Sequence, residues 1–205
     1  EMTSSLVGSE MCIRDSCNLA ESFETNPSVD VSYSDAATGA RQIKLLGLAG
    51  TYVQMLTENY PNFRGAASLY GLDYVPGAWM ESIQVSKGTS SVKNGYEALA
   101  GQINVEFKKP PTADIFSVNL FGSDAGRYEG NADASWHIND KVSTGLLVHY
   151  SNDKMQHDGN DDGFLDTPLK EQVNLMNRWY HKLDHYVAQY GVRYLHENRT
   201  GGQST

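Results

Sequence analysis

The stretch Val75–Lys109, VPGAWMESIQVSKGTSSVKNGYEALAGQINVEFKK, decides the fold of the first half of this chain. It contains two short runs, Ile83–Val85 and Ile103–Phe107, in which apolar and polar residues alternate. This two-residue period is typical of half-buried strands. Between the runs lie three glycines, Gly88, Gly95 and Gly101. Glycine marks places where the chain turns, so the residues alone predict a strand, a compact loop and a returning strand.

The residues before this stretch mix short strands with turns. Val29–Tyr33 alternates, and Gln42–Leu48 begins a second apolar strand. Gly50–Leu56 is compatible with a strand or with a helix, and the sequence leaves both open. The Pro and Gly content after it predicts a loop over Glu58–Gly65, followed by a short helix over Ala66–Tyr70. The first half is therefore expected to be a small α+β unit.

The pattern changes after Pro110-Pro111, which we interpret as a linker because proline breaks both helices and sheet ladders. Tyr128–Ile138 is the clearest of the long alternating strands beyond it. Its odd-numbered residues are mostly polar, and its even-numbered ones are mostly apolar. Its eleven residues are about the length that crosses a bilayer at a tilt.

Several further segments show the same division into an apolar and a polar face. They begin near Phe116, Val142, Gln172 and Tyr186. Leu147 and Val187 break the pattern because they put apolar side chains on the polar face. A soluble antiparallel sandwich would also alternate, but the polar faces here are unusually charged and the strands unusually long.

The motif in Val75–Lys109 resembles the plug-domain signature of TonB-dependent outer-membrane receptors, and the resemblance extends over about Val29 to Gln203. It implies an α+β plug domain over residues 17–109. Antiparallel transmembrane β-barrel strands follow over residues 110–205, about the first five of roughly 22 in such transporters. The barrel would be incomplete. Gly88, Gly95, Gly101 and Asn104 match the plug motif and are assigned structural roles.

The resemblance implies a receptor in the outer membrane of a Gram-negative cell, in contact with its lipid. Such a receptor imports a scarce nutrient, either an iron chelate, cobalamin, a glycan or a peptide, into the periplasm. The TonB complex supplies the energy through a segment expected before Cys17. We expect Tyr60, Arg64 and Tyr70 to contact the substrate, together with the Asn152–Glu171 loop. An upstream domain that would make it a signalling receptor stays open.

The Asn152–Glu171 segment also contains an acidic loop with the oxygen-ligand spacing of a calcium site. The candidate ligands are Asp158, Asn160, Asp162 and Asp166, arranged around Gly163. The twelfth position is Leu169 rather than a bidentate glutamate. Calcium and a plain acidic surface loop therefore stay open. A calcium-ordered all-β surface module without transport is the competing function.

The first sixteen residues, EMTSSLVGSEMCIRDS, resemble the translation of a sequencing adapter and are set aside from the fold argument. Cys17 is then the single remaining cysteine, which supports neither a disulfide framework nor a zinc site. The chain has 25 acidic and 16 basic residues, a balance that disfavours nucleic-acid binding. The sequence offers no catalytic set with usable spacing, so an enzyme is not expected.

Overall fold

A computed structural model of the chain describes residues 3–5, 18–23, 29–35, 38–45, 47–48, 50–88 and 97–203. The chain divides into two compact units, Glu1–Phe107 and Lys108–Thr205. The division falls close to the double proline that the sequence marks as a linker. In the part of the chain that is described, no helix is long and apolar enough to cross a membrane.

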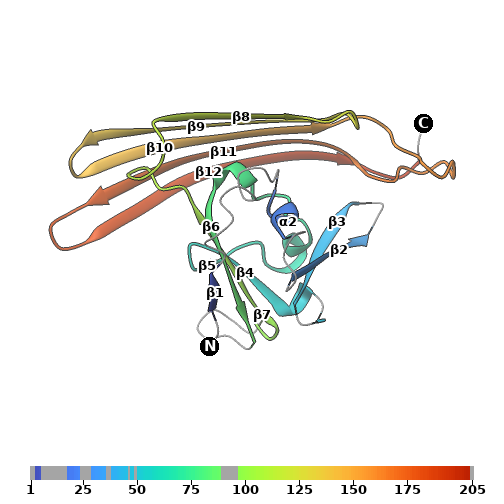
Figure 1. The fold of residues 1–205 in the computed structure, drawn as a ribbon, viewed down its shortest axis with the longest axis horizontal. Coiled ribbons are helices and arrows are strands. Elements are labelled where there is room, and N and C mark those ends of the chain that lie inside the picture. Colours follow the sequence, from blue (N-terminus) through green and yellow to red (C-terminus); the bar gives the residue numbers. More distant parts are fainter. Residues whose placement is uncertain are drawn as a thin grey trace. The chain divides into compact units, whose positions relative to one another are not determined.

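The first unit is built on a five-stranded sheet with the order β1-β6-β7-β4-β5 (Figure 1). Its strands are β1 (Thr3–Ser5), β4 (Val53–Thr57), β5 (Tyr60–Pro61), β6 (Met80–Lys87) and β7 (Gly101–Phe107). β4 runs parallel to β7, and the other pairs are antiparallel. The pairing of β6 with β7 is the predicted strand and returning strand.

Short elements complete the first unit. They are α2 (Leu19–Ser22), the hairpin β2 (Val29–Asp35) and β3 (Ala40–Leu45), and the 3-10 turns η1 (Gly50–Tyr52), η2 (Gly65–Leu69) and η3 (Gly77–Trp79). For Gly50–Leu56 the sequence allowed either a helix or a strand. The structure has one 3-10 turn, η1, followed directly by the strand β4. The short helix expected after the Tyr60 loop is the 3-10 turn η2.

Alternate residues of β6 and β7 form the apolar core of the first unit. Ile83, Val85, Ile103 and Val105 are each at most 2% exposed. Trp79 is fully buried, and its ring meets that of Phe107 edge-on at 6.1 Å between centroids. Burying one large apolar side chain contributes about 1.5–3 kcal/mol. The alternation in the sequence thus becomes a water-excluding sheet face.

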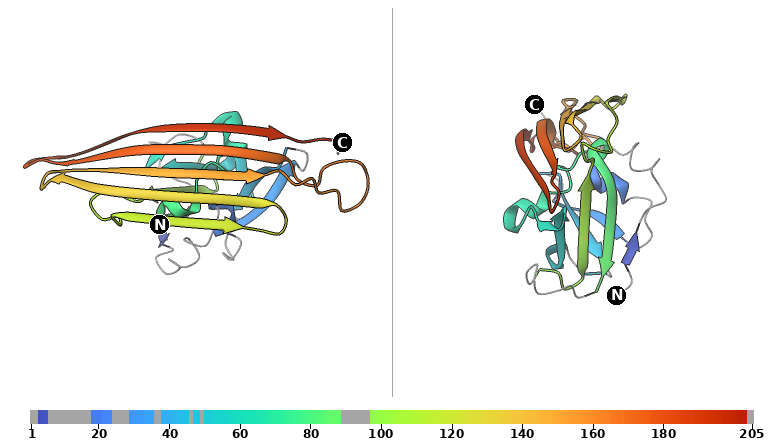
Figure 2. Two further views of the ribbon diagram at one scale, coloured as in Figure 1. Left: turned by 90° about the horizontal axis from the view of Figure 1, so that it is seen from above. Right: turned by 90° about the vertical axis from the view of Figure 1, so that its left-hand side faces the viewer.

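The second unit is one antiparallel sheet in which neighbours in sequence are neighbours in space, in the order β12-β11-β10-β9-β8 (Figure 2). The strands are β8 (Phe116–Gly122), β9 (Arg127–Asn139), β10 (Val142–Asp153), β11 (Leu169–Lys182) and β12 (Val187–Thr200). β9 to β12 have 12 to 14 residues, enough to cross a bilayer at a tilt. Among the described residues this sheet is open, with β8 and β12 at its edges.

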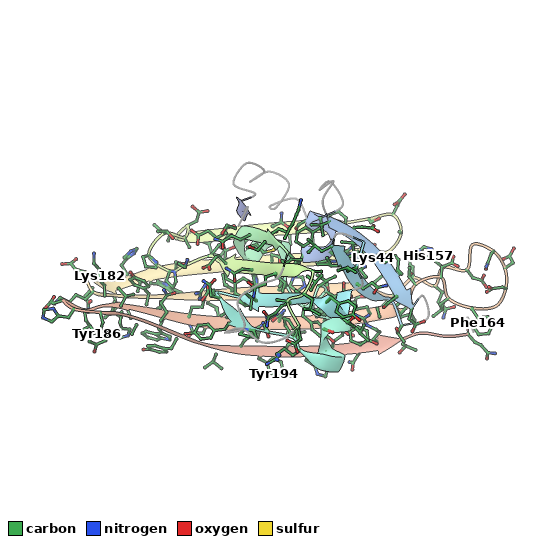
Figure 3. The ribbon with its side chains drawn as sticks, turned by 90° about the horizontal axis from the view of Figure 1, so that it is seen from below. Lys44, His157, Phe164, Lys182, Tyr186 and Tyr194 are labelled. Carbon is green, nitrogen blue, oxygen red and sulfur yellow. The ribbon has the colours of Figure 1, made fainter. Side chains whose placement is uncertain are left out.

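The connections of this sheet differ in length at its two ends. A two-residue turn joins β9 to β10, and a short turn joins β11 to β12, with Lys141 Nζ 2.9 Å from Asp184 Oδ1 across the two turns. The β10–β11 connection, residues 154–168, is the long one. Lys182 and Tyr186 lie at the short-turn end, and His157 and Phe164 lie at the long-loop end (Figure 3). Short turns at one end and a long loop at the other are typical of outer-membrane barrels.

Candidate functional site

In the second unit's sheet, apolar side chains are exposed on one face and polar side chains are buried on the other. A water-soluble sheet has the reverse arrangement. Large apolar side chains are exposed on one face: Phe116, Val118, Leu120, Tyr128, Trp136, Ile138, Leu146, Tyr150, Leu175, Tyr190, Val192 and Tyr194. Polar side chains are buried on the other: Glu129, Asn131, Asp133, Ser135, Ser143, His149, Ser151, Gln172, Asn174 and Arg178. Barrels with a wet interior and a lipid-facing exterior have this arrangement.

Ion pairs and hydrogen bonds join the polar side chains on the buried face. Lys108 Nζ lies 3.0 Å from Asp133 Oδ1, and Arg178 donates to the Lys108 carbonyl at 2.8 Å. His149 Nδ1 is 2.8 Å from Asn131 Oδ1, and Asn131 donates to Glu129. These bonds matter because a buried polar group without a partner is costly.

The end of the buried face near the long loop carries a second set of charges. Glu197 Oε1 lies 3.0 Å from Arg199 Nε on the same strand, β12. Glu197 Oε2 lies 3.9 Å from Lys170 Nζ on the neighbouring strand, β11. Arg193 donates to Asn174 at 2.9 Å across the same two strands. Cross-strand pairs of this kind fix the register of neighbouring strands.

An aromatic row crosses the exposed face near the short turns. Trp136, Thr144, Trp179 and Tyr190 are cross-strand neighbours on β9 to β12. The rings of Trp179 and Tyr190 are stacked, 6.2 Å apart and 4° from parallel. Asn177, one row further in, accepts the Trp179 indole N–H at 2.7 Å. Aromatic side chains gather in this way at a membrane–water boundary.

The faces assigned to these strands from sequence are confirmed. Leu147, which breaks the alternation, lies on the polar face and is only 3% exposed. His149 and His137 both lie on the polar face of the sheet, by the pairing of β9 with β10. His149 is buried there, whereas His137 lies near the β9–β10 turn and is exposed.

The plug loop predicted to meet substrate begins at Tyr60, which is 77% exposed. Arg64 follows, and its Nε lies 2.9 Å from Glu97 Oε2. Tyr70 lies after η2, where its ring is 6.4 Å from that of Tyr74. Of these three candidates, Arg64 lines a cavity of about 260 Å³ in the first unit, whereas Tyr60 and Tyr70 are not among its lining residues. Substrate contact by all three stays a prediction.

This loop is held by backbone conformation and by side chains. Glu58, Asn59 and Phe63 have φ values of 51°, 65° and 52°, in the left-handed region. The Asn59 N–H donates to the Asn104 side chain at 2.8 Å, which ties the loop to β7. Asn62 donates to Thr57 at 2.9 Å. The loop therefore has a defined shape.

Three of the plug-motif residues, Gly88, Gly101 and Asn104, lie in the described part of the chain. A Cβ on Gly101 would lie 2.2 Å from the Ser86 carbonyl oxygen, and Gly88 has a φ of 91° that side chains rarely adopt. Asn104 is buried and also donates to Glu106 at 3.2 Å. Gly95 lies outside the described residues. The structural roles assigned to these four positions remain predictions.

The acidic loop is closed by its own hydrogen bonds. Asp158 accepts the N–H groups of Asp162 and Gly163 at 3.1 and 3.0 Å. Asp166 accepts the N–H of Gly159 at 2.7 Å, and Asn160 donates to Asp162 at 2.9 Å. Within the described part of the chain, no three His, Cys, Asp or Glu side chains form a group that could hold a metal ion. Calcium in this loop stays a prediction.

Sequence reasoning missed Glu97, the ion-pair partner of Arg64, and the buried Gln54, which lines the same cavity. Glu97 follows Arg64 by 33 residues, so no local pattern links them. It also missed Lys108 and Arg178, which join the start of the second unit to its sheet. The positive charges of these two residues were the one feature of the sequence that could have pointed to them.

Residues 3–102 match the family model of the TonB-dependent receptor plug domain. The match begins inside the segment that resembles an adapter, and Thr3–Ser5 pairs with β6. The origin of the first sixteen residues therefore stays a prediction. The comparison with curated proteins gave no match.

Three solved structures illustrate the likeness. The siderophore receptor PiuA from Acinetobacter baumannii has a TM-score of 0.73 at 15% identity, over 95% of this chain and 26% of its own. The ferric yersiniabactin uptake receptor FyuA from Yersinia pestis gives 0.72 at 13%, over 94% and 31%. The ferric enterobactin receptor PfeA from Pseudomonas aeruginosa gives 0.71 at 15%, over 96% and 33%. The chain thus spans between a quarter and a third of their lengths.

The fold and the family match define the class. The chain contains the plug domain of a TonB-dependent receptor and, after it, antiparallel strands that resemble the start of the receptor barrel. TonB-dependent receptors are outer-membrane transport proteins rather than enzymes, and the outer membrane is the location of this chain.

Proposed function

We propose that the protein is an outer-membrane importer that binds a scarce extracellular nutrient and passes it to the periplasm with energy from the TonB complex. The main support is the exposed apolar face of β9 to β12, which requires a hydrocarbon environment. The plug-domain match supports energised transport rather than passive diffusion. A calcium-ordered surface module would expose this apolar face to water, which disfavours the competing function.

Spin labels test the membrane part of the proposal. Labels at Ala132 and Ala134, on the face with the exposed apolar side chains, should be accessible to oxygen dissolved in lipid. Labels at Asn131 and Asp133, on the buried polar face, should be much less accessible to that oxygen than the labels at Ala132 and Ala134. The reverse result would overturn the proposal.

Growth measurements test the transport part. A deletion strain should lose growth when its nutrient is supplied at low concentration, and the same defect should follow loss of the energising complex. Iron chelates are the first class to supply, because the matched structures are siderophore receptors. Cobalamin, glycans and peptides are the next classes. Unchanged growth on all four classes would contradict import.

The unpaired edges of β8 and β12 give a third test. An open sheet edge cannot face hydrocarbon, because its N–H and C=O groups would have no partners. The 205-residue piece expressed alone should therefore form no closed pore in a planar bilayer. Steady conductance from this piece would contradict the assignment of its strands to a larger barrel.

A further inference from the structure

The cavity in the first unit has opposite charges side by side in its wall. Arg64 Nε and Glu97 Oε2 are 2.9 Å apart, and both residues line the cavity. The Arg64 side chain is 48% exposed and that of Glu97 is 20% exposed. Water therefore screens the pair, and pairs of this kind are weak. A ligand that enters here can separate the two side chains at small cost.

The loop backbone presents Arg64 in a fixed place. Phe63 and Gly65, on either side of Arg64, have φ values of 52° and 62°. An aromatic residue rarely adopts such a conformation, and backbone outliers gather where function needs a fixed geometry. The Phe63 ring lies 5.5 Å from that of Tyr74 and so anchors the loop. A group that is already ordered pays less entropy when a ligand binds.

The other walls of the cavity are mixed. Thr51, Gln54 and Asn62 are polar, and Val53 and Met55 are apolar. Gln54 is held on the sheet, because its Oε1 accepts from the Gln102 side chain at 2.7 Å. The volume of about 260 Å³ lies below the roughly 300–1,000 Å³ of pockets for drug-sized ligands. A fitting ligand is therefore small, with charge at one end and a short apolar part.

We infer that this cavity binds a free α-amino acid with a short apolar side chain. Its carboxylate would accept hydrogen bonds from the Arg64 guanidinium, whose planar fork suits that group. Its ammonium group would donate to Glu97. A ligand with both charges leaves neither side chain unpaired when the ion pair opens. A simple anion would leave Glu97 unpaired, and a simple cation would leave Arg64 unpaired.

This site goes beyond the proposed import function. Arg64 is also a candidate for nutrient contact, but amino-acid binding to the plug can be measured whichever nutrient is carried and without the energising complex. Binding is therefore measured on the purified protein, whereas import is measured by growth. Failure of one measurement leaves the other standing.

Calorimetric titration of the protein in detergent micelles with L-valine tests the inference. L-valine should bind saturably. N-acetyl-L-valine lacks the ammonium charge and L-valinamide lacks the carboxylate, so each should bind at least tenfold more weakly. Absence of saturable L-valine binding, or equal binding of either blocked analogue, would overturn the inference.

Substitutions test whether the ligand binds at the ion pair. Arg64→Gln and Glu97→Gln should each weaken L-valine binding at least tenfold. Lys141→Gln is the matched control, since it removes one partner of the exposed 2.9 Å pair with Asp184, outside the cavity. Its affinity for L-valine should match that of the unaltered protein. Unchanged affinity in both cavity variants would place the ligand elsewhere and overturn the inference. If a cavity variant fails to fold, the blocked analogues decide the question on the unaltered protein.

Discussion

β7 of the first unit and β9 of the second follow the same two-residue alternation, but β7 buries its apolar face and β9 buries its polar face. In β7 the buried residues include Ile103 and Val105, whereas in β9 they include Asn131 and Asp133. The period of a sequence thus defines a strand and its two faces. The surroundings, water or hydrocarbon, decide which face lies inside. Four pairs of substitutions test this contrast, in order of decreasing effect.

Removing a tryptophan from each unit is the most severe test. Trp79→Ala should lower the free energy of unfolding by about 3–5 kcal/mol, because the residue is fully buried against Phe107. Trp136→Ala should cost less than half as much, since half of this side chain faces outward. Urea unfolding in detergent micelles, followed by circular dichroism, measures both. Equal losses would mean that the two faces do not differ in burial.

A charge placed on the outward face should also be costly. Val148→Arg on β10 should destabilise the protein by about 2–4 kcal/mol if this position faces the bilayer midplane. Asp140→Arg, in the exposed β9–β10 turn, is the control and should change stability by less than about 0.5 kcal/mol. Unfolding in lipid vesicles measures the difference. A tolerated arginine at position 148 would argue for an aqueous outward face.

Adding a methyl group compares the packing of the two units. Gly101→Ala should cost about 1–3 kcal/mol, because its Cβ would overlap the Ser86 carbonyl oxygen. Gly130→Ala on β9 should be neutral or stabilise slightly, since the nearest atom to its Cβ would be Leu120 Cδ2 at 3.5 Å. The same unfolding assay separates them. A tolerated alanine at position 101 would show that the close approach of β6 and β7 can relax.

The last pair of substitutions concerns the acidic loop, the part of the second unit that we expect to lie outside the membrane. Asp158→Ala removes the acceptor of two backbone N–H groups, so it should loosen the loop by about 1 kcal/mol and speed proteolysis within residues 154–168. Asp161→Asn keeps a residue that tolerates the left-handed φ of 54° and should behave like the unaltered protein. If the predicted site exists, calcium at ten times its dissociation constant should raise the free energy of unfolding of the loop by about 1.4 kcal/mol. No protection by calcium would leave a plain acidic loop.

Local patterns in the sequence were enough to predict the strands and their faces. The alternation in Tyr128–Ile138 placed β9 and both of its faces. Gly88 and Gly101 were informative because turns and close backbone approach require glycine. These features depend on neighbours in sequence, which is why a single chain reveals them.

Contacts between distant residues could not be predicted. The pairing of Arg64 with Glu97 depends on how the Tyr60 loop returns beside the segment before β7, and no local spacing encodes it. The bond from Asn59 to Asn104 likewise spans 45 residues. Leu147 interrupts the alternation, yet it is buried on the polar face, where its cross-strand neighbours are Asp133 and Met176. Register across strands, rather than the period along them, sets these contacts.

The chain's three tryptophans occupy three different environments, and this gives the protein a built-in set of optical reporters. Trp79 is enclosed in the first unit, Trp136 faces outward, and Trp179 is stacked on Tyr190 with its indole N–H bonded to Asn177. Indole emission shifts toward the red as the surroundings become more polar. Variants that retain one tryptophan each would let the unfolding of the first unit be timed separately from that of the strands.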